Sequence, residues 1–204
     1  MRDRVGDGSG SGSGGGGGLG GGAADVPPLR VAVIIGSTRE GRAGGEVGRW
    51  FIAGARGRTD LELSVIDLID FDFPARLPAR PTAPMADFAA RVDQADAFVV
   101  VTPEYNRSFP ASLKQAIDYA YDEWHFKPVA FVSYGLGSHG LNAVEQLRPV
   151  FTELHTVTVR NTVGVNLLEE GWEEQERSCQ PMLDQLGWWG LVLREARAAR
   201  PHVS

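Results

Sequence analysis

Several features that define other classes of protein are missing from this chain. It has one cysteine, Cys179, among 204 residues, which excludes an internal disulfide framework and any zinc or iron–sulfur site built from several cysteines. No window of about 18 apolar residues occurs, so we expect no membrane-spanning helix. The N-terminus has no apolar stretch of signal-peptide type, and we therefore expect a cytoplasmic protein.

The chain also lacks an excess of basic residues. Its 20 lysines and arginines face 26 aspartates and glutamates, which gives a net charge of −6. Nucleic-acid binding depends on cations that displace the counterions of phosphates, so this balance argues against a nucleic-acid partner. A local basic pocket for a small anion is still compatible with it.

Large apolar side chains are scarce in residues 1–28, which hold 12 of the 26 glycines. Such a segment buries too little surface to offset the entropy lost on ordering, so we predict a disordered Gly/Ser-rich tail over residues 1–28. The remaining residues, 29–204, are enough for one packed core, and we predict a single domain there.

From Leu29 onward, strand and helix patterns alternate. The predicted strands cover residues 29–35, 61–66, 97–101, 127–133 and 155–160. The predicted helices cover 44–58, 86–94, 111–122, 142–154 and 173–199, and a proline-rich loop covers 67–85. This alternation predicts an α/β fold, a doubly wound parallel sheet of five strands with helices on both faces. Ligands of such sheets bind beyond the carboxyl ends of the strands, which directs attention to the loops after the first, third and fourth strands.

The loop after the first strand, residues 36–45, leads into a helix. Helix N-termini attract anions, and the hydroxyls of Ser37 and Thr38 add donors. Arg39 and Arg42 add guanidinium groups that bind phosphate oxygens in pairs. No Gly-Lys-Ser/Thr follows, so a nucleoside triphosphate with magnesium is disfavoured. We predict a phosphate-binding loop, and the alternative is an ordinary loop with two solvated arginines.

The loop after the third strand is bracketed by Pro103 and Pro110. Its aromatic Tyr105 and its amide Asn106 suit a flat heteroaromatic ligand, with backbone groups at the polar edges and the ring over a face. The alternative, of equal weight, is a rigid turn whose tyrosine packs on the sheet edge. Glu104 fits a general base and a surface carboxylate equally well.

The loop after the fourth strand contains Gly135-x-Gly137-x-x-Gly140, which spells the dinucleotide-binding fingerprint. That fingerprint belongs to the first strand–turn–helix unit and needs an acidic residue at the end of the next strand, but here the next predicted strand ends at Arg160. We therefore predict a glycine loop that makes room for a ring system. His139, in the same loop, is predicted to be a solvated side chain.

The chain offers no arrangement for nucleophilic or metal catalysis. No cluster of His, Cys, Asp and Glu has metal-ligand spacing, and Ser37 and Ser133 lack the Gly-x-Ser-x-Gly context of a hydrolase nucleophile. Cys179 lies on the last predicted helix and is expected to pack there. Trp188 and Trp189 on that helix are expected in the core or at a subunit contact.

Two motifs resemble the NAD(P)H-dependent FMN reductase family. One is Gly36-Ser37-Thr38-Arg39 with Gly41-Arg42. The other, which is highly specific, is Thr102-Pro103-Glu104-Tyr105-Asn106-x-Ser108-x-Pro110-x-x-Leu113-Lys114-x-Ala116-Ile117-Asp118. The match continues through residues 127–135 and 143–148 and covers roughly residues 29–164.

The resemblance implies a flavodoxin-like fold with strand order 2-1-3-4-5 and a non-covalently bound FMN. It places the FMN phosphate on Ser37, Arg39 and Arg42. It places the isoalloxazine ring system between two groups of residues, which are Pro103, Glu104, Tyr105 and Asn106 on one side and Ser133, Gly135 and Gly137 on the other. The chain departs from the family at two places: His139-Gly140 replaces a Gly-Gly pair, and Asn142 stands where the family often has an arginine.

The implied activity is hydride transfer from NADPH or NADH through bound FMN to a small acceptor such as a flavin, a quinone or an azo compound. Because the flavin supplies the chemistry, we predict no catalytic side chain. The alternatives are a non-enzymatic flavin-binding electron carrier or redox-sensing module, and a reductase that supplies reduced FMN to a partner monooxygenase. The family also implies a homodimer or homotetramer, with Leu113, Lys114, Ile117 and Asp118 at the subunit contact.

Overall fold

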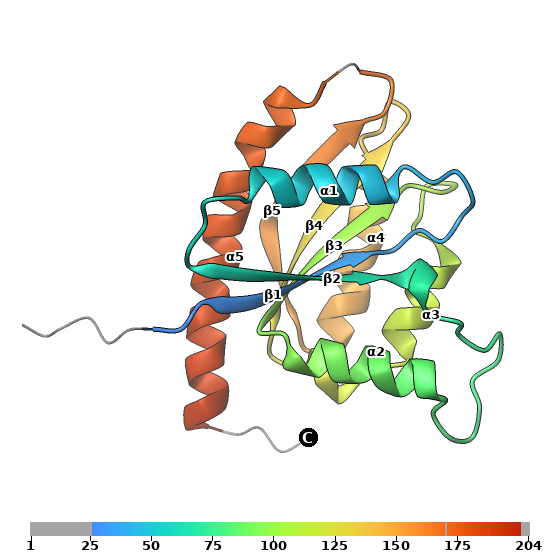
Figure 1. Cartoon of the computed structure of the whole chain (residues 1–204), viewed down its shortest axis with the longest axis vertical. Helices are drawn as coiled ribbons and strands as arrows, with labels where there is room; N and C mark the ends of the chain where they lie inside the picture. The colour runs from blue at the N-terminus through green and yellow to red at the C-terminus, as the bar shows by residue number, and fades with distance from the viewer. Residues whose placement is uncertain (1–25, 170, 201–204) are drawn as a thin grey trace, which may run out of the picture.

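The computed structural model describes residues 26–169 and 171–200, and all but the last three residues of the predicted tail lie outside this range. The described chain forms one sheet of five parallel strands with helices on both faces (Figure 1). The strands are β1 (Leu29–Ile35), β2 (Leu61–Asp67), β3 (Ala97–Pro103), β4 (Pro128–Gly135) and β5 (Val157–Asn166). The helices are α1 (Gly44–Gly54), α2 (Ala83–Gln94), α3 (Ala111–Asp118), α4 (Leu141–Glu153) and α5 (Glu173–Ala199), with short 3-10 turns at Leu68–Asp70 and Asp122–Trp124.

The strand order is β2-β1-β3-β4-β5, and every pair is parallel. This confirms the predicted doubly wound sheet. From β1 the chain adds β2 on one side and then returns to add β3 on the other, so the order reverses between β1 and β3. The carboxyl ends of all five strands point to one edge of the sheet (Figure 1). A ligand site is expected at this edge, beside the reversal.

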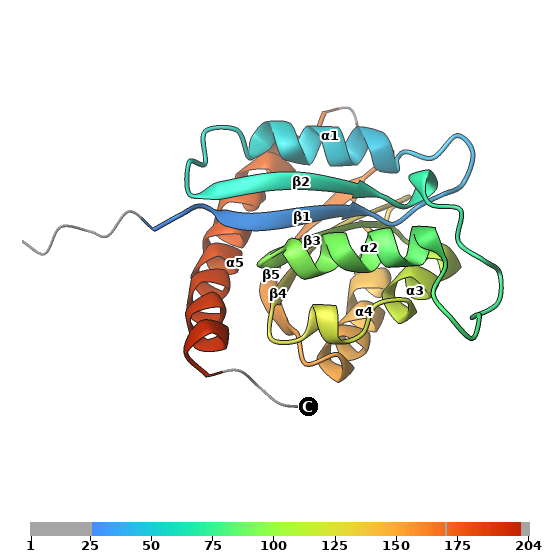
Figure 2. The ribbon, with the colours of Figure 1, turned by 60° about the horizontal axis from the view of Figure 1, so that its bottom comes forward.

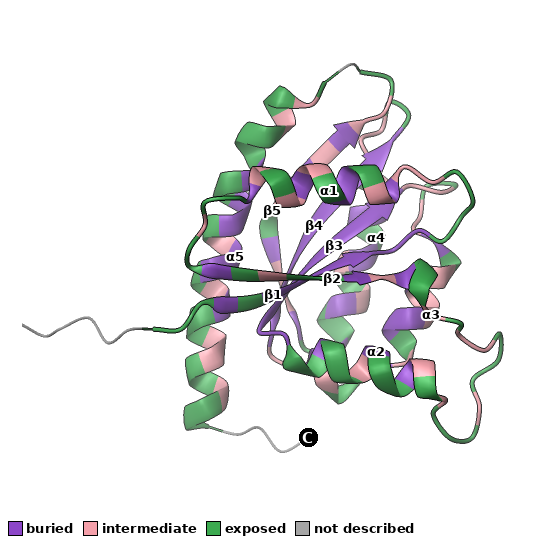
Figure 3. Cartoon of the chain, in the orientation of Figure 1, coloured by how far each residue is buried: buried purple, intermediate pink, exposed green. Residues whose placement is uncertain are grey.

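The three central strands are buried on both faces because helices cover each side of the sheet (Figure 2). One hydrophobic cluster joins the sheet to α1 and α5, and a second joins it to α2, α3 and α4. Buried residues therefore run almost without a break along β1, β3 and β4 (Figure 3). This double burial explains the continuous β-branched runs in the sequence.

Strand β5 is longer than predicted. The prediction of residues 155–160 was wrong at both ends, since the strand runs from Val157 to Asn166. Its pairing with β4 is irregular: Thr158 is opposite Val129 and Thr162 is opposite Phe131, so β5 holds two extra residues there. Such a bulge breaks the alternation of side chains that identifies a strand in a sequence.

Helix α3 faces the sheet with two of the residues that the resemblance implied at a subunit contact. Leu113 and Ile117 are each 1% exposed and pack in the core of their own chain. Asp118 is exposed and Lys114 is partly exposed, and the Lys114 ammonium group donates to both Asp118 carboxylate oxygens at 2.6 and 2.7 Å. Only the polar face of α3 is therefore available to a second subunit.

The edge of the sheet opposite the carboxyl ends is tied together by Asp96, which is buried just before β3. Its carboxylate accepts two bonds from the Arg30 guanidinium, at 3.0 and 3.1 Å, and one from the Arg30 backbone N–H. Arg194 and Arg197 of α5 lie 3.7 and 3.6 Å from the same carboxylate.

Among residues 26–169 and 171–200, no helix combines the length and the hydrophobicity that a membrane span requires.

Candidate functional site

The loops after β1, β3 and β4 meet at the carboxyl edge, and hydrogen bonds join them. The backbone N–H of Gly36 donates to the Val101 carbonyl at 2.9 Å, and the N–H of Glu104 donates to the Tyr134 carbonyl at 2.9 Å. The Ser112 hydroxyl at the start of α3 donates to the Gly36 carbonyl at 3.1 Å. The structure thus brings the three predicted loops into one site.

Ser37 connects the first loop to the second. It is fully buried, and its hydroxyl lies 3.0 Å from the Tyr105 hydroxyl. This contact places Tyr105 against the first loop, next to the point where the strand order reverses. The contact fits both alternatives for Tyr105, a ring that covers a ligand and a ring that packs on the end of the sheet, and the ligand-covering role stays a prediction.

The two arginines of the first loop have different surroundings. Arg42 makes a paired hydrogen bond with the Asp67 carboxylate at 2.7 and 2.5 Å and donates to the Ser37 carbonyl at 2.7 Å. The bond with Asp67 raises the pKa of Arg42 against the opposing effect of burial. Arg39 is exposed. Its backbone carbonyl accepts from the Arg42 N–H at 3.2 Å, but its guanidinium makes no hydrogen bond or ion pair with any described residue. A ligand therefore meets a free guanidinium at Arg39 and a largely occupied one at Arg42, where three of five donors are in use.

Helix α1 begins at this loop without a side-chain cap. Ala43 occupies the N-cap position, and within the described residues no side chain accepts from the first N–H groups of the helix. The first turn packs closely on the sheet: a Cβ on Gly44 would lie 2.8 Å from the Tyr134 hydroxyl. An uncapped helix start with open backbone N–H groups and a positive dipole end is a site for an anion.

The second loop forms a tight turn from Tyr105 to Ser108. The two residues exchange backbone hydrogen bonds of 2.8 and 2.9 Å. Asn106 and Arg107 at its centre have positive φ angles of 50° and 63°, the combination of a type I′ turn. Asparagine tolerates this conformation, but arginine does so at a cost, so the surrounding structure must hold the turn in place.

Glu104 joins the second loop to the third. Its carboxylate accepts from the Asn142 backbone N–H at 3.0 Å and from the Asn142 side-chain amide at 2.9 Å. Burial raises the pKa of Glu104, but hydrogen bonds from Asn142 and Ser138 lower it further, so the net pKa lies below the ordinary value. The group is a carboxylate at neutral pH. It is a structural acceptor here and not a poised general base.

The third loop is shaped by buried contacts of its own. The Ser133 hydroxyl, nearly fully buried, donates to the His139 carbonyl at 2.7 Å. Gly140 has a φ of +76°, and a Cβ there would lie 2.6 Å from both the Ser133 Cβ and the Tyr134 nitrogen. Gly137 is open on its outer side, and its N–H donates to the Asn166 side-chain oxygen at 3.1 Å. Gly140 therefore allows close packing on β4, while Gly137 lies at an open position; that the loop makes room for a ring system stays a prediction.

The hydroxyl of Tyr134, at the end of β4, is buried and has no hydrogen-bond partner in the described chain. Burial raises its pKa, more than the nearby Ser37 hydroxyl lowers it. The group lies beneath the start of α1 and is closed off from ligands, so it belongs to the wall of the site. Sequence reasoning gave no role to Tyr134 or Asp67, and it noted Asn142 only as a departure from the family pattern. The bonds of Asn142 to Glu104 were not predicted, because no motif pairs the two residues.

The described residues contain no group of three or more His, Cys, Asp or Glu side chains that could hold a metal ion.

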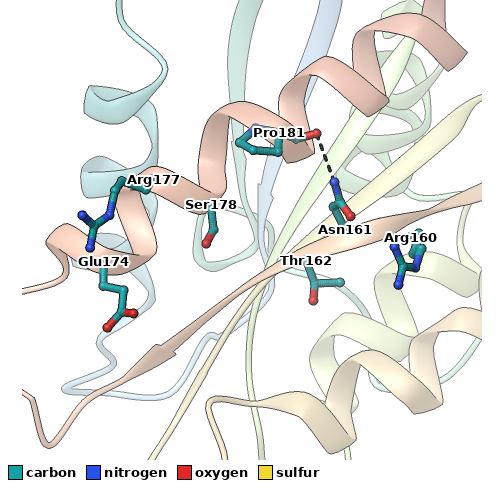
Figure 4. Close-up of a pocket in the computed structure, with 7 residues that line it drawn as sticks. All are labelled: Arg160, Asn161, Thr162, Glu174, Arg177, Ser178 and Pro181. Atoms are coloured by element: carbon teal, nitrogen blue, oxygen red, sulfur yellow. Dashed lines mark hydrogen bonds between the residues drawn. The ribbon is translucent and has the colours of Figure 1, made fainter.

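A cavity of about 710 Å³ lies away from the carboxyl edge, between the outer edge of β5 and the first half of α5 (Figure 4). It is open, and it is lined by Arg160, Asn161, Thr162, Glu174, Arg177, Ser178 and Pro181.

The features at the carboxyl edge can be compared with the predicted phosphate-binding and ring-binding loops. The uncapped start of α1 and the free guanidinium of Arg39 suit the phosphate. The tight turn at Tyr105 and Gly137, with nothing within 4 Å of a Cβ there, belong to the two other loops at this edge. The sheet order β2-β1-β3-β4-β5, with these loops gathered beside the reversal of strand order, defines a flavodoxin-like protein.

Comparison with known proteins supports this class and narrows it. FerB, a flavoenzyme NAD(P)H:(acceptor) oxidoreductase from Paracoccus denitrificans, superposes with a TM-score of 0.68 at 24% identity over 80% of this chain and 98% of that one, which shows the fold. The family of NADPH-dependent FMN reductases matches residues 29–169. The chain belongs to this family.

Two relatives illustrate the range within the family. An NAD(P)H-dependent FMN reductase of Schizosaccharomyces pombe is 33% identical over 132 residues, which are 59% of this chain and 64% of that protein. The chain thus aligns with less than two thirds of that protein's length. A quinone reductase of Pseudomonas putida is 31% identical over 78% of this chain and 93% of its own length.

Proposed function

We propose that the protein is an FMN-dependent oxidoreductase that passes a hydride from NADPH or NADH through bound FMN to a small acceptor. The observation that carries this proposal is the uncapped start of α1 beside the free Arg39 guanidinium, at the reversal of strand order in a member of this family. The relatives named FMN reductase and quinone reductase support flavins and quinones as the classes of acceptor.

The ten predicted residues divide into three groups in this proposal. Arg39 and the backbone at the start of α1 bind the phosphate, with Ser37 and Arg42 fixing the shape of that loop. Pro103, Glu104, Tyr105 and Asn106 border one side of the ring system. Ser133, Gly135 and Gly137 form the other side.

FMN, when bound, supplies the chemistry of accepting and donating a hydride. The chain's own residues bind, orient and exclude water. Tyr105 is held against the first loop by Ser37, so its ring has a fixed position. Glu104 is an ionised hydrogen-bond acceptor that fixes the third loop, and no side chain is required to gain or lose a proton.

The proposal is tested first by binding. The purified chain, freed of cofactor and titrated with FMN, is expected to bind it with micromolar or tighter affinity, and riboflavin much more weakly because it lacks the phosphate. Equal affinity for FMN and riboflavin would contradict the phosphate site, and no binding of either would contradict the proposal. The predicted cytoplasmic location, homo-oligomeric state and monooxygenase partner stay predictions.

A further inference from the structure

Asn142, the second residue of α4, forms hydrogen bonds to the second loop through its backbone N–H and through both polar atoms of its side chain. Its backbone N–H donates to Glu104 Oε2 at 3.0 Å, and its side-chain Nδ2 donates to Glu104 Oε1 at 2.9 Å. Its side-chain Oδ1 accepts from Arg107 Nη2 at 3.2 Å. The amide of Asn142 therefore stands between a carboxylate and a guanidinium, and its orientation is fixed by both.

Gln146 supports the same loop one helical turn further along α4. Its Oε1 accepts from the Ser108 hydroxyl at 2.6 Å, and its Nε2 donates to the Arg107 carbonyl at 2.9 Å. These bonds hold the turn whose central residues have positive φ angles. Gln146 makes no hydrogen bond with Glu104 among the described residues. Gln146 therefore bonds only to the turn, whereas Asn142 bonds both to the turn and to the Glu104 carboxylate.

The Glu104 carboxylate has only neutral groups as direct partners. No described residue forms an ion pair with it. The nearest cation of the loop, Arg107, is exposed and bonds to the Asn142 amide, and its charge lowers the pKa of Glu104 less than the hydrogen bonds from Asn142 and Ser138 do. Solvent screens such a charge, and the dipole of α4 compensates for only part of a unit charge. The half-buried carboxylate therefore keeps most of its negative charge at the border of the site.

We propose, as an inference that rests on the proposed function, that Asn142 is a positioning residue. It holds the Glu104 carboxylate beside the flavin without cancelling the negative charge of that carboxylate. As a result, the protein binds oxidised FMN more tightly than reduced FMN. The reduced flavin ring carries a negative charge at neutral pH, and like charges repel at close range. Tighter binding of the oxidised form lowers the reduction potential of the bound flavin. The chain thereby gains driving force for passing electrons on to an acceptor.

The test compares the reduction potential of bound FMN in the full-length protein and four variants, by anaerobic equilibration with a reference dye. Glu104→Gln removes the charge and is expected to favour reduced over oxidised FMN by about tenfold relative to wild type. A tenfold change in this preference raises the reduction potential of the bound FMN by about 30 mV, because the couple transfers two electrons. Asn142→Ala frees the carboxylate and is expected to raise the potential by a smaller amount.

The third and fourth variants separate charge from structure. In the Glu104→Gln background, Asn142→Ala is expected to add no further shift, because Asn142 acts on the potential through Glu104. Gln146→Ala loosens the turn without touching the charge, so it is expected to weaken oxidised and reduced FMN equally and to leave the potential unchanged. Affinities for both redox forms are measured alongside by fluorescence titration.

Two results would overturn the inference while leaving the proposed function intact. One is a potential that Glu104→Gln does not change although FMN still binds. The other is a shift from Asn142→Ala that is the same with and without Glu104. If Glu104→Gln loses FMN, the single Asn142→Ala variant decides, since an unchanged potential there contradicts the inference. A wild-type chain that takes up no FMN would instead overturn the proposed function itself.

Discussion

Among single residues, Arg39 and Arg42 show how the partners of a side chain decide its role. Both are loop arginines three positions apart, and both were predicted to bind phosphate. Arg42 is bound to Asp67 and to the Ser37 carbonyl, so it stabilises the loop before any ligand arrives. Arg39 has no such partner in the described structure, so its guanidinium is available.

Replacing Arg39 by alanine is expected to weaken FMN binding by about ten- to a hundredfold. A charge-assisted hydrogen bond contributes roughly 1.5–3 kcal/mol, and about 1.4 kcal/mol corresponds to a tenfold change in affinity. Riboflavin, which lacks the phosphate, is expected to bind the variant as it binds wild type. The measurement is a titration of both ligands, with Arg80→Ala, an exposed arginine of the proline-rich loop, as the matched control.

An equal loss for FMN and riboflavin would place Arg39 away from the phosphate. An unchanged FMN affinity would return it to the alternative of a solvated side chain.

The sequence predicted the three loops but not the bonds that organise them. The Arg42–Asp67 pair spans 25 positions, Glu104–Asn142 spans 38 and Ser37–Tyr105 spans 68. Partners so far apart leave no periodic signal, and only the folded sheet brings them together. The motifs therefore predict which loops form the candidate site, while the different surroundings of Arg39 and Arg42 depend on tertiary contacts.

On the scale of elements, two glycines in the loop between β4 and α4 differ in how closely other atoms surround them. Gly137 and Gly140 both have positive φ angles, of 87° and 76°. Only Gly140 is crowded, since a Cβ there would lie 2.6 Å from backbone and side-chain atoms of β4, while nothing lies within 4 Å of a Cβ on Gly137.

Alanine at these two positions is expected to have unequal effects. Gly137→Ala costs only the strained backbone conformation, about 1–2 kcal/mol of unfolding free energy. Gly140→Ala adds a steric clash with β4, so it is expected to cost clearly more and to weaken FMN binding by displacing the third loop. Denaturant unfolding and an FMN titration of both variants measure this. Equal destabilisation by the two substitutions would contradict the crowding argument.

The boundaries of an element were predicted well where a continuous apolar run marks a buried strand. They were predicted poorly where a bulge interrupts the side-chain pattern of a strand. Residues 29–35 were predicted as a strand and form one to the residue. Helix α2 begins at Ala83 instead of residue 86 because Pro84 fits the first turn. In β5, the two extra residues and Gly164 concealed the second half of the strand. Gly164 is required because a Cβ there would lie 2.9 Å from the Cβ of His139.

The ion cluster at Asp96 ties β1, β3 and α5 together and makes stability depend on pH. Burial raises the pKa of Asp96, but the hydrogen bonds and charge of Arg30 lower it further, so the net pKa lies below its ordinary value. A carboxyl group with a lowered folded-state pKa stabilises the fold above its unfolded pKa of about 3.9. That contribution disappears as the pH falls through the folded-state pKa.

Asp96→Asn is therefore expected to reduce the free energy of unfolding by about 3 kcal/mol at pH 7, because it leaves Arg194 and Arg197 without their buried counter-ion. The difference from wild type is expected to shrink as the pH falls below about 4. Urea unfolding at several pH values measures both effects. Asp87→Asn, which breaks an exposed ion pair with Arg91, is the control and is expected to change stability by less than about 1 kcal/mol. A pH-independent difference would contradict the linkage.

For the molecule as a whole, one sheet and its two helix layers account for the described chain. We therefore predict that residues 1–25 are dispensable for stability and for FMN binding. Their glycine-rich composition offers little surface to bury. Residues 26–28 are different, because Arg194 donates to the Pro27 and Pro28 carbonyls at 3.0 and 3.1 Å. Removing residues 1–25 is expected to change neither the melting temperature nor the FMN affinity. Removing residues 1–28 is expected to lower stability by about 1–2 kcal/mol. A loss of FMN binding after the shorter truncation would show that the tail has a role in the site.

The most direct test of the proposed activity is an anaerobic stopped-flow experiment on the full-length protein loaded with FMN. On mixing with NADPH or NADH, the account predicts loss of the oxidised flavin absorbance within seconds, and its return when a quinone is added. Reduction by dithionite but by neither nicotinamide cofactor would contradict the account and favour a flavin-binding electron carrier instead.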